Sequence, residues 1–152
     1  MTSNAPFSVT LSGVSLIMSP PNTASGSFTV TLTLSDGVNT AITTMTIGIS
    51  NLPPYFSPAL IPQTIHSFVT STYTFGPTID PEGAVVTITV SGLQPSWMSF
   101  SGSTLTMSPQ ITTLLTAYSI TVTITDGVNI VPIALVVNVI NTPPACASTP
   151  AS

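Results

Sequence analysis

The sequence predicts an all-β chain of tandem antiparallel β-sandwiches, of which the first is incomplete. Composition is the first reason: 15 Pro and 9 Gly punctuate segments rich in Thr, Val and Ile, which favours strands and turns over helices. A repeat is the second: residues 28–39 (FTVTLTLSDGVN) recur 90 positions later as residues 118–129 (YSITVTITDGVN). A disordered Ser/Thr-rich stalk is the alternative, and the 43% hydrophobic content argues against it.

Alternation of apolar and hydroxyl side chains defines the strands of this repeat. In residues 28–35 the apolar side chains occupy every second position, so one face of a strand meets a core and the other meets solvent. Asp36-Gly37 and Asp126-Gly127 supply turns into second strands. The first copy continues with Thr43, Met45, Ile47 and Ile49 in the same alternation. Shorter strands are expected at 71–75, 85–90 and 104–107.

The repeat also sets the expected domain boundaries. Residues 11–20 match 100–109, and residues 51–54 (NLPP) match 141–144 (NTPP). Residues 55–144 therefore form one complete repeat, and residues 1–54 correspond to the second half of another repeat, which needs strands from elsewhere. Residues 145–152 form a Pro/Ser/Ala tail, in which the single Cys146 has no disulfide partner within the chain.

Three motifs resemble the dystroglycan-type cadherin-like repeats and related immunoglobulin-like domains of large extracellular surface proteins. Residues 51–56 (NLPPYF) resemble the linker and first strand, residues 93–100 (LQPSWMSF) the central Trp motif, and residues 118–127 the penultimate strand. The resemblance implies an immunoglobulin/cadherin-like sandwich of seven strands and a role in adhesion or scaffolding. The chain departs from the family pattern at Ala84, where a second acidic pair is expected.

Charge excludes several classes of function. Only four residues are acidic and none is Lys or Arg, so no cationic surface for nucleic acid or anionic lipid can form. No apolar run is long enough for a membrane helix, so membrane insertion is not expected. One His and one Cys make no metal cluster, and no motif places a Ser beside His66 for a catalytic triad. We therefore expect that the chain is not an enzyme. Trp97 is expected in the core rather than on a sugar-binding surface.

Calcium is the one candidate cofactor, and none is expected to be obligatory. In an immunoglobulin-like topology the loop carrying Asp80 and Glu82, the loop carrying Asp126 and the linker carrying Asn51 meet at one end of the sandwich. Three carboxylates with an Asn and main-chain carbonyls make a weak calcium site. The alternative is that Asp80-Pro81 and Asp126-Gly127 only form turns.

Hydroxyl groups and an apolar strand suggest modification and assembly. Candidate O-glycosylation sites lie on the solvent face of the first copy, at Thr29, Thr31, Thr33, Thr44 and Thr46. The last strand of the second copy is apolar on both faces, which predicts an interface formed by Ala134, Val136 and Ile140. The alternative is that the tail, residues 145–152, covers this patch.

The function expected from these features is structural. The chain would be a subunit of an extracellular or cell-surface filament or assembly, and copies of itself would be its partners, joined by strand complementation and apolar packing. The alternative is an adhesion or ligand-binding segment of a large multi-repeat surface protein with a weak calcium site.

Overall fold

A computed structural model describes residues 1–94, 96–110 and 112–142. Within these ranges every regular element is a β-strand, which confirms the all-β fold class. The chain divides into two compact units. The first contains residues 1–54 with the loops 80–86 and 125–130, and the second contains the remaining residues from 55 onward. A search of the described residues finds no helix with the length and hydropathy of a membrane span.

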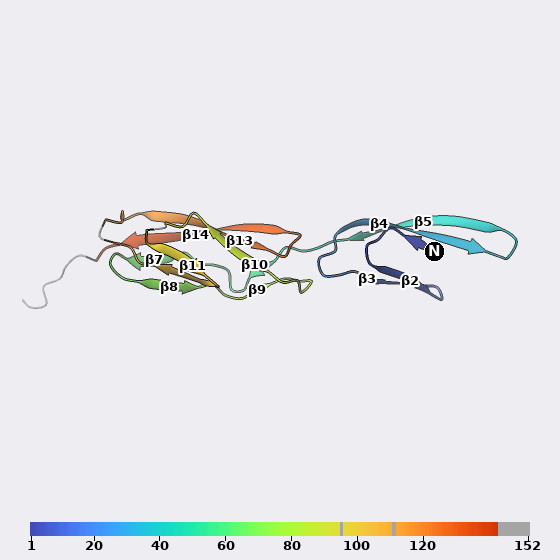
Figure 1. The fold of residues 1–152 in the computed structure, drawn as a ribbon, viewed down its shortest axis with the longest axis horizontal. Coiled ribbons are helices and arrows are strands. Elements are labelled where there is room, and N and C mark those ends of the chain that lie inside the picture. Colours follow the sequence, from blue (N-terminus) through green and yellow to red (C-terminus); the bar gives the residue numbers. More distant parts are fainter. Residues whose placement is uncertain (95, 111, 143–152) are drawn as a thin grey trace, which may run out of the picture. The chain divides into compact units, whose positions relative to one another are not determined.

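The first unit is built from two antiparallel sheets. Strands β1 (Thr2–Ser3), β4 (Gly26–Ser35) and β5 (Thr40–Ile49) form one sheet in the order β1-β4-β5, and β2 (Ser8–Ser12) pairs with β3 (Ser15–Ser19) (Figure 1). The β4–β5 hairpin is long, with its register running from Ser35 opposite Thr40 to Gly26 opposite Ile49. Its core is small: Val30 is fully buried, and the ring of Phe7 meets that of Phe28 edge-on at 5.2 Å.

In the part of the chain that the structure describes, the second unit contains nine strands. Their bounds are β6 (Tyr55–Phe56), β7 (Gln63–His66), β8 (Ser71–Thr74), β9 (Thr78–Ile79), β10 (Thr87–Ser91), β11 (Met98–Ser101), β12 (Thr104–Met107), β13 (Ala117–Thr125) and β14 (Ile130–Ile140). One sheet has the order β10-β13-β14-β7 and the other β11-β12-β8, with β6 and β9 as a separate pair. This is an immunoglobulin-like β-sandwich, and the first unit is its incomplete counterpart.

One strand pair departs from the expected antiparallel arrangement. Strand β7 runs parallel to β14, with Gln63 beside Val137 and Ile65 beside Val139. A parallel pair needs a crossover connection, and here the chain passes through the strands from β8 to β13 between the two partners. The sequence pattern gives no sign of this direction because alternation is the same in both kinds of ladder.

The core of the second unit follows the predicted alternation. Leu105 of β12, in the other sheet, is fully buried. Alternate residues of β13 and β14 are also almost fully buried: Ile120, Val122, Ile124, Leu135, Val137 and Val139. Phe75 packs its ring against those of Phe56 at 5.9 Å, Tyr73 at 5.6 Å and Phe100 at 5.3 Å. Trp97 is 8% exposed and meets Tyr118 edge-on at 5.0 Å, so the expected core position of Trp97 is confirmed.

In the first unit the predicted burial is wrong at several positions. The alternation places Leu34 and Met45 on a core face, yet Leu34 is 61% exposed and Met45 is 43% exposed. The corresponding side chains of the second unit, Ile124 and Leu135, are 0% and 1% exposed. The physical reason is that two sheets of three and two strands cannot cover the full length of the β4–β5 hairpin.

Several strand boundaries also differ from those expected. The predicted strand 85–90 begins at Thr87, and Val85 is 87% exposed after a turn in which Gly83 has a φ of +79°. Strands β2, β3, β7 and β11 are not apparent from the sequence because they are short and rich in Ser, Thr or Gln. The tail expected at 145–152, with Cys146, lies outside the described residues.

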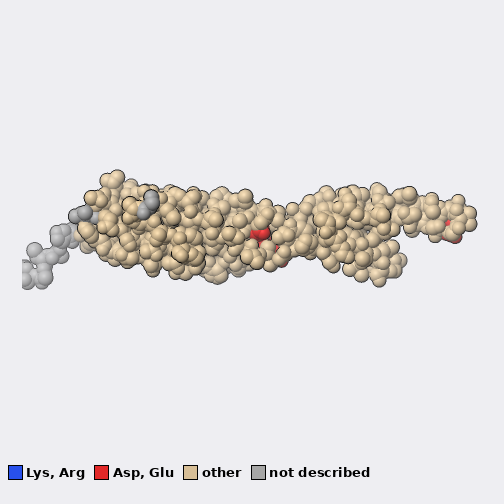
Figure 2. All heavy atoms as spheres, viewed as in Figure 1, with Lys and Arg blue, Asp and Glu red and all other residues tan. Residues whose placement is uncertain are grey.

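Charge is as sparse on the surface as in the sequence. Figure 2 shows Asp and Glu residues as small red areas on one face of the molecule, among residues of other types in tan. With no Lys or Arg in the chain, these carboxylates have no side-chain cation other than His66 to pair with.

Candidate functional site

The loop between β13 and β14 is organised by Asp126. Its Oδ1 accepts hydrogen bonds from the main-chain N–H groups of Val128 at 2.7 Å and Asn129 at 2.6 Å. The Asn129 side-chain Nδ2 donates to Asp126 Oδ2 at 3.0 Å. The local sequence explains this geometry, because an Asp followed by Gly folds back to bond its own main chain.

Burial and hydrogen bonding act in opposite directions on the Asp126 carboxyl. Only 4% of the residue is exposed, and this desolvation raises its pKa. The hydrogen bonds from the Asn129 side chain and from the N–H groups of Asn129 and Val128 favour the carboxylate, and together they hold the pKa below the ordinary value of 3.8. Asp126 is thus a buried anion stabilised by amide donors.

Two further asparagines connect this loop to the linker and to residue 83. Asn129 Nδ2 donates to Asn51 Oδ1 at 2.6 Å, and Asn51 Nδ2 donates to the carbonyl of Asn22 at 2.8 Å. Asn22 Nδ2 in turn donates to the carbonyl of Gly83 at 3.0 Å. All of these residues belong to the first unit. Hydrogen bonds from uncharged Asn side chains therefore link these segments of the chain.

Asp80 and Glu82 complete the acidic part of this cluster. Asp80 Oδ1 accepts from the N–H groups of Glu82 at 3.1 Å and Ala84 at 2.7 Å, which fixes the turn. Glu82 Oε2 accepts from the N–H of Leu52 at 3.2 Å. Asp80 Oδ2 is buried and has no hydrogen-bond partner among the described residues. A buried carboxylate oxygen without a donor is unusual, since such groups are costly to desolvate.

The four residues expected at a calcium site are thus part of one unit, and hydrogen bonds link two of them, Asn51 and Asp126, through Asn129. Asp80 and Glu82 instead bond main-chain N–H groups. In the described part of the chain no three Asp, Glu, His or Cys side chains are grouped so that they could hold a metal ion together. Asp80 and Asp126 each stabilise a turn, as the alternative interpretation of these motifs expects, and the calcium site stays a prediction.

Asn22 and Asn129 were not singled out from the sequence. Asn129 carries a usable signal, because it is the last residue of the repeated segment and its partner Asn39 occupies the same place in the first copy. Asn22 carries none. Its role depends on a contact with Gly83, which is 61 positions away.

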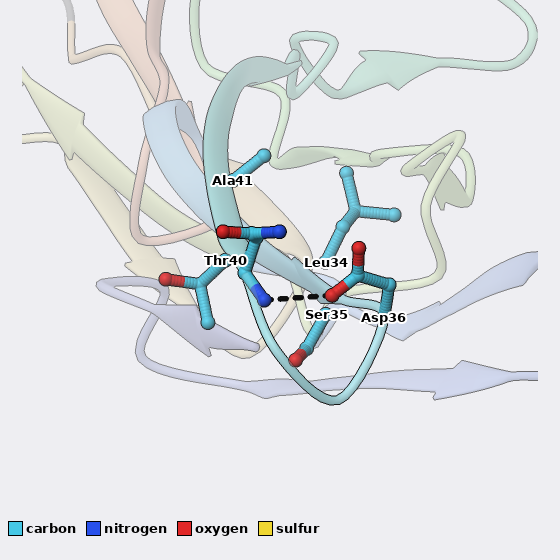
Figure 3. A pocket seen from close by; sticks show the side chains of 6 residues that line it. Leu34, Ser35, Asp36, Thr40 and Ala41 are labelled. Atoms are coloured by element: carbon cyan, nitrogen blue, oxygen red, sulfur yellow. Dashed lines mark hydrogen bonds between the residues drawn. The ribbon is translucent and has the colours of Figure 1, made fainter.

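The first copy of the same motif has the same internal geometry in a different environment. Asp36 Oδ1 accepts from the N–H groups of Val38 at 2.9 Å and Asn39 at 2.7 Å, which lowers the pKa of the exposed Asp36. Beside this turn lies a hollow of about 380 Å³, lined by Leu34, Ser35, Asp36, Asn39, Thr40 and Ala41 (Figure 3).

The outer face of β14 carries the residues expected at an interface. Ala134 and Ile140 are exposed, the latter to 40%, and Val136 is half-buried. Their neighbours Leu135, Val137 and Val139 point into the core. This strand thus presents apolar groups outward, and its use as an interface stays a prediction.

The remaining candidates lie on strands of the two units. Of the candidate glycosylation sites, Thr29, Thr33, Thr44 and Thr46 are exposed and Thr31 is half-buried. His66 is exposed in β7, where its Nδ1 lies 2.9 Å from Thr142 Oγ1. No Ser–His pair suited to nucleophilic catalysis occurs among the hydrogen bonds of residues 1–94, 96–110 and 112–142.

Comparison with known proteins finds similar solved structures but does not assign the chain to a family. No family model and no curated protein matches the chain. An endo-fucoidan hydrolase of glycoside hydrolase family 107 is similar with 22% identity and a TM-score of 0.49, over 93% of this chain. The chain spans 23% of the length of that hydrolase. A chimeric titin Z1Z2-Z1Z2 tandem is similar with 17% identity and a TM-score of 0.41, covering 94% of this chain and 79% of the titin chain.

These neighbours correct one expectation. The sequence predicted that the chain is not an enzyme, and that exclusion does not stand, because segments of similar fold occur in endo-fucoidan hydrolases. The absence of Lys, Arg and a recognisable triad bears only on particular catalytic mechanisms. The likeness concerns the fold alone and transfers no activity.

Proposed function

We propose that the chain is a structural module of an extracellular or cell-surface filament or assembly, in which copies join by strand pairing and apolar packing. The observation that carries the proposal is the difference between equivalent positions of the two copies. Leu34 and Met45 are 61% and 43% exposed, whereas Ile124 and Leu135 in the second copy are buried. Exposed apolar side chains in a regular β-sheet are characteristic of a surface that is covered in the assembled state.

Open strand edges support the same proposal. In the second unit β7 lies along β14 and β8 lies along β12. In the first unit β5 and β3 are the equivalent strands, and among the described residues β5 pairs with β4 and β3 with β2. Edge strands with free N–H and C=O groups accept a further strand readily. In the second unit, β7 pairs with the edge of β14. Every copy of the chain has a β7 strand, so a strand of this type is available to pair with β5 of another copy.

The surface chemistry favours assembly by uncharged contacts. With no cation in the chain, ion pairs between copies are not available except through His66 or the amino terminus. Hydroxyl-bearing faces such as Thr29, Thr33 and Thr44 offer sites for O-linked sugars, which would keep a nearly uncharged surface soluble. We include this modification in the proposal.

Sedimentation velocity over a wide concentration range tests the proposal. The expected result is a weight-average mass that rises above 15.6 kDa with concentration, with filaments visible by electron microscopy. Met45→Lys, which places a charge on the exposed apolar face, should suppress this growth. Val14→Lys is the matched control, since Val14 is fully exposed in the β2–β3 turn and lies apart from that face. A wild-type chain that stays at 15.6 kDa throughout would refute the proposal.

A second function, an adhesion segment with a weak calcium site, is favoured by one observation. Asp80 Oδ2 is buried and finds no hydrogen-bond partner in residues 1–94, 96–110 and 112–142, and a bound cation would satisfy it together with main-chain carbonyls. Isothermal titration with calcium chloride is the test: heat of binding that disappears in Asp80→Asn supports the site. Asp36→Asn is the control, because Asp36 is exposed and lies in the other hairpin.

A further inference from the structure

The two copies of the sequence DGVN differ in what surrounds them. Residues 36–39 and 126–129 make the same turn, in which the Asp Oδ1 accepts from two main-chain N–H groups. Asp126 is 4% exposed, whereas Asp36 is exposed, and Val38 is 89% exposed against 39% for Val128. One copy of the turn is covered by a partner segment and the other is open.

The segment that meets the covered copy is known. Asn51 Oδ1 accepts the hydrogen bond from Asn129 Nδ2 at 2.6 Å, and Asn129 Nδ2 also lies 3.4 Å from the carbonyl of Asn51. Asn51 begins the sequence NLPP, and the chain contains one equivalent of it, NTPP at 141–144. Asn141 and Thr142 are exposed. Each chain therefore carries an open turn and an exposed segment of the type that covers such a turn.

We propose that the turn 36–39 of one copy binds Asn141-Thr142 of a second copy, with Asn39 Nδ2 donating to Asn141 Oδ1 as Asn129 donates to Asn51. The inference rests on the proposed assembly and names one of its joints. Because the two halves of the joint are different surfaces of the same chain, the contact is head-to-tail and can be repeated without limit.

The hollow beside the open turn suits this occupant. It has a volume of about 380 Å³, and Figure 3 shows Leu34, Asp36 and Ala41 around it. Leu34 makes part of the hollow apolar, and the Asp36 carboxylate already accepts hydrogen bonds from main-chain N–H groups. A small uncharged segment with an amide and a hydroxyl group is therefore a suitable ligand for the hollow. A cationic partner segment is excluded for a second copy, because residues 138–144 (NVINTPP) contain no Lys, Arg or His.

Asn141 is free to change partner. Its Oδ1 accepts from Ser67 Oγ at 3.2 Å, a long contact between the exposed Asn141 and the half-buried Ser67 that water replaces at little cost. Asn51, its equivalent, makes closer contacts in the covered joint, at 2.6 Å and 2.8 Å.

Paramagnetic relaxation between copies tests the joint. Cys146 is the single thiol of the sequence, so a nitroxide can be attached to it, five positions after Asn141. Labelled chain is mixed with nitrogen-15 chain that carries no label. The expected result is selective broadening of the Gly37, Val38 and Asn39 amide signals, with the Gly13 and Val14 turn unaffected.

Two single variants and their mixture provide a second measurement. Asn39→Ala and Asn141→Ala should each weaken self-association about fivefold, the effect of one neutral hydrogen bond. Each variant retains one intact half of the joint, so a mixture should regain pairwise association without long polymers. Val14→Ala is the control and should assemble like wild type.

The outcomes separate this joint from the wider proposal. Suppose that wild-type chains assemble but the Asn39→Ala variant self-associates as tightly as wild type, or that the nitroxide broadens amide signals of β5 instead of those of the turn. Either result overturns the contact between Asn39 and Asn141 and leaves the proposed assembly intact. If wild-type chains do not associate at any concentration, both are overturned.

Discussion

At the scale of single residues, burial rather than sequence sets the role of an aspartate. Asp36 and Asp126 occupy the same place in the same tetrapeptide and accept the same main-chain hydrogen bonds. Asp126 additionally receives the side chain of Asn129, which also holds Asn51. The same residue type thus closes an exposed turn in one copy and anchors a hydrogen-bonded network in the other.

The lowered pKa of Asp126 predicts a loss of stability in acid. A group whose pKa is lower in the folded state stabilises the fold above its unfolded pKa, and this contribution disappears as the pH falls below 3.8 toward the folded value. Asp126→Asn should lower the unfolding temperature at neutral pH and flatten its dependence on pH below 3.8. Scanning calorimetry across this range provides the measurement.

Asp36→Asn is the matched comparison. Its pKa is also lowered, chiefly by the main-chain N–H groups of Asn39 and Val38, but the residue is exposed and does not contact the linker. Its unfolding temperature should change less than that of Asp126→Asn. Equal changes in the two variants would contradict the role assigned to the network around Asn129.

At the scale of elements, one strand pattern produces two different degrees of burial. Strands β4 and β13 share their alternation, and their central residues Val30 and Ile120 are both fully buried. Toward the hairpin the two strands diverge, because β13 lies between β10 and β14 in a four-stranded sheet packed on a second sheet. Strand β4 has only β1, a two-residue strand, beside β5.

This difference predicts unequal effects of one substitution at equivalent positions. Ile124→Ala should lower the free energy of unfolding by about 3 kcal/mol, because it leaves a cavity in a packed core. Leu34→Ala should change it by no more than about 0.5 kcal/mol, since 61% of Leu34 is already exposed. Urea denaturation at concentrations where the chain is monomeric gives both values. A cost for Leu34→Ala near that of Ile124→Ala would show that Leu34 is covered within the monomer.

At the scale of the whole molecule, exposed apolar groups occur where strands lack cover. Several of them lie on the β4–β5 hairpin and on the outer face of β14, with Ile42, Ile130 and Ile140 at 71%, 74% and 40% exposure. In a chain of net charge −4 without cations, little long-range repulsion opposes contact between such surfaces at physiological salt. Apolar packing is therefore the main force available for assembly.

The outer face of β14 leads to a prediction about assembly. Val136→Asp should prevent growth of the polymer, because an unpaired carboxylate would be buried in the contact. Ser99→Asp on β11 is the control, since Ser99 is exposed and lies in the other sheet. Light scattering measures growth, and circular dichroism checks that both variants are folded. If the Val136→Asp variant forms polymers as wild type does, Val136 is not part of the interface.

The sequence by itself determined the fold class, the period of the repeat and the long strands. Residues 28–35 and 118–125 are strands because apolar and hydroxyl groups alternate over enough positions to outweigh any local preference, and Asp-Gly fixes the turns that follow. Trp97 was also placed correctly in the core. These features depend on residues that are near one another in the chain.

Only the tertiary structure decided which of the repeated positions are buried and what the polar residues contact. The sequence treats Leu34 and Ile124 alike, and their exposure differs because strands from distant parts of the chain cover one and not the other. The contacts of Asn22 with Gly83 and of Asn129 with Asn51 span 61 and 78 positions, so no local pattern encodes them. Burial and long-range hydrogen bonds are properties of the assembled sheets, and therefore the candidate site became visible only in the fold.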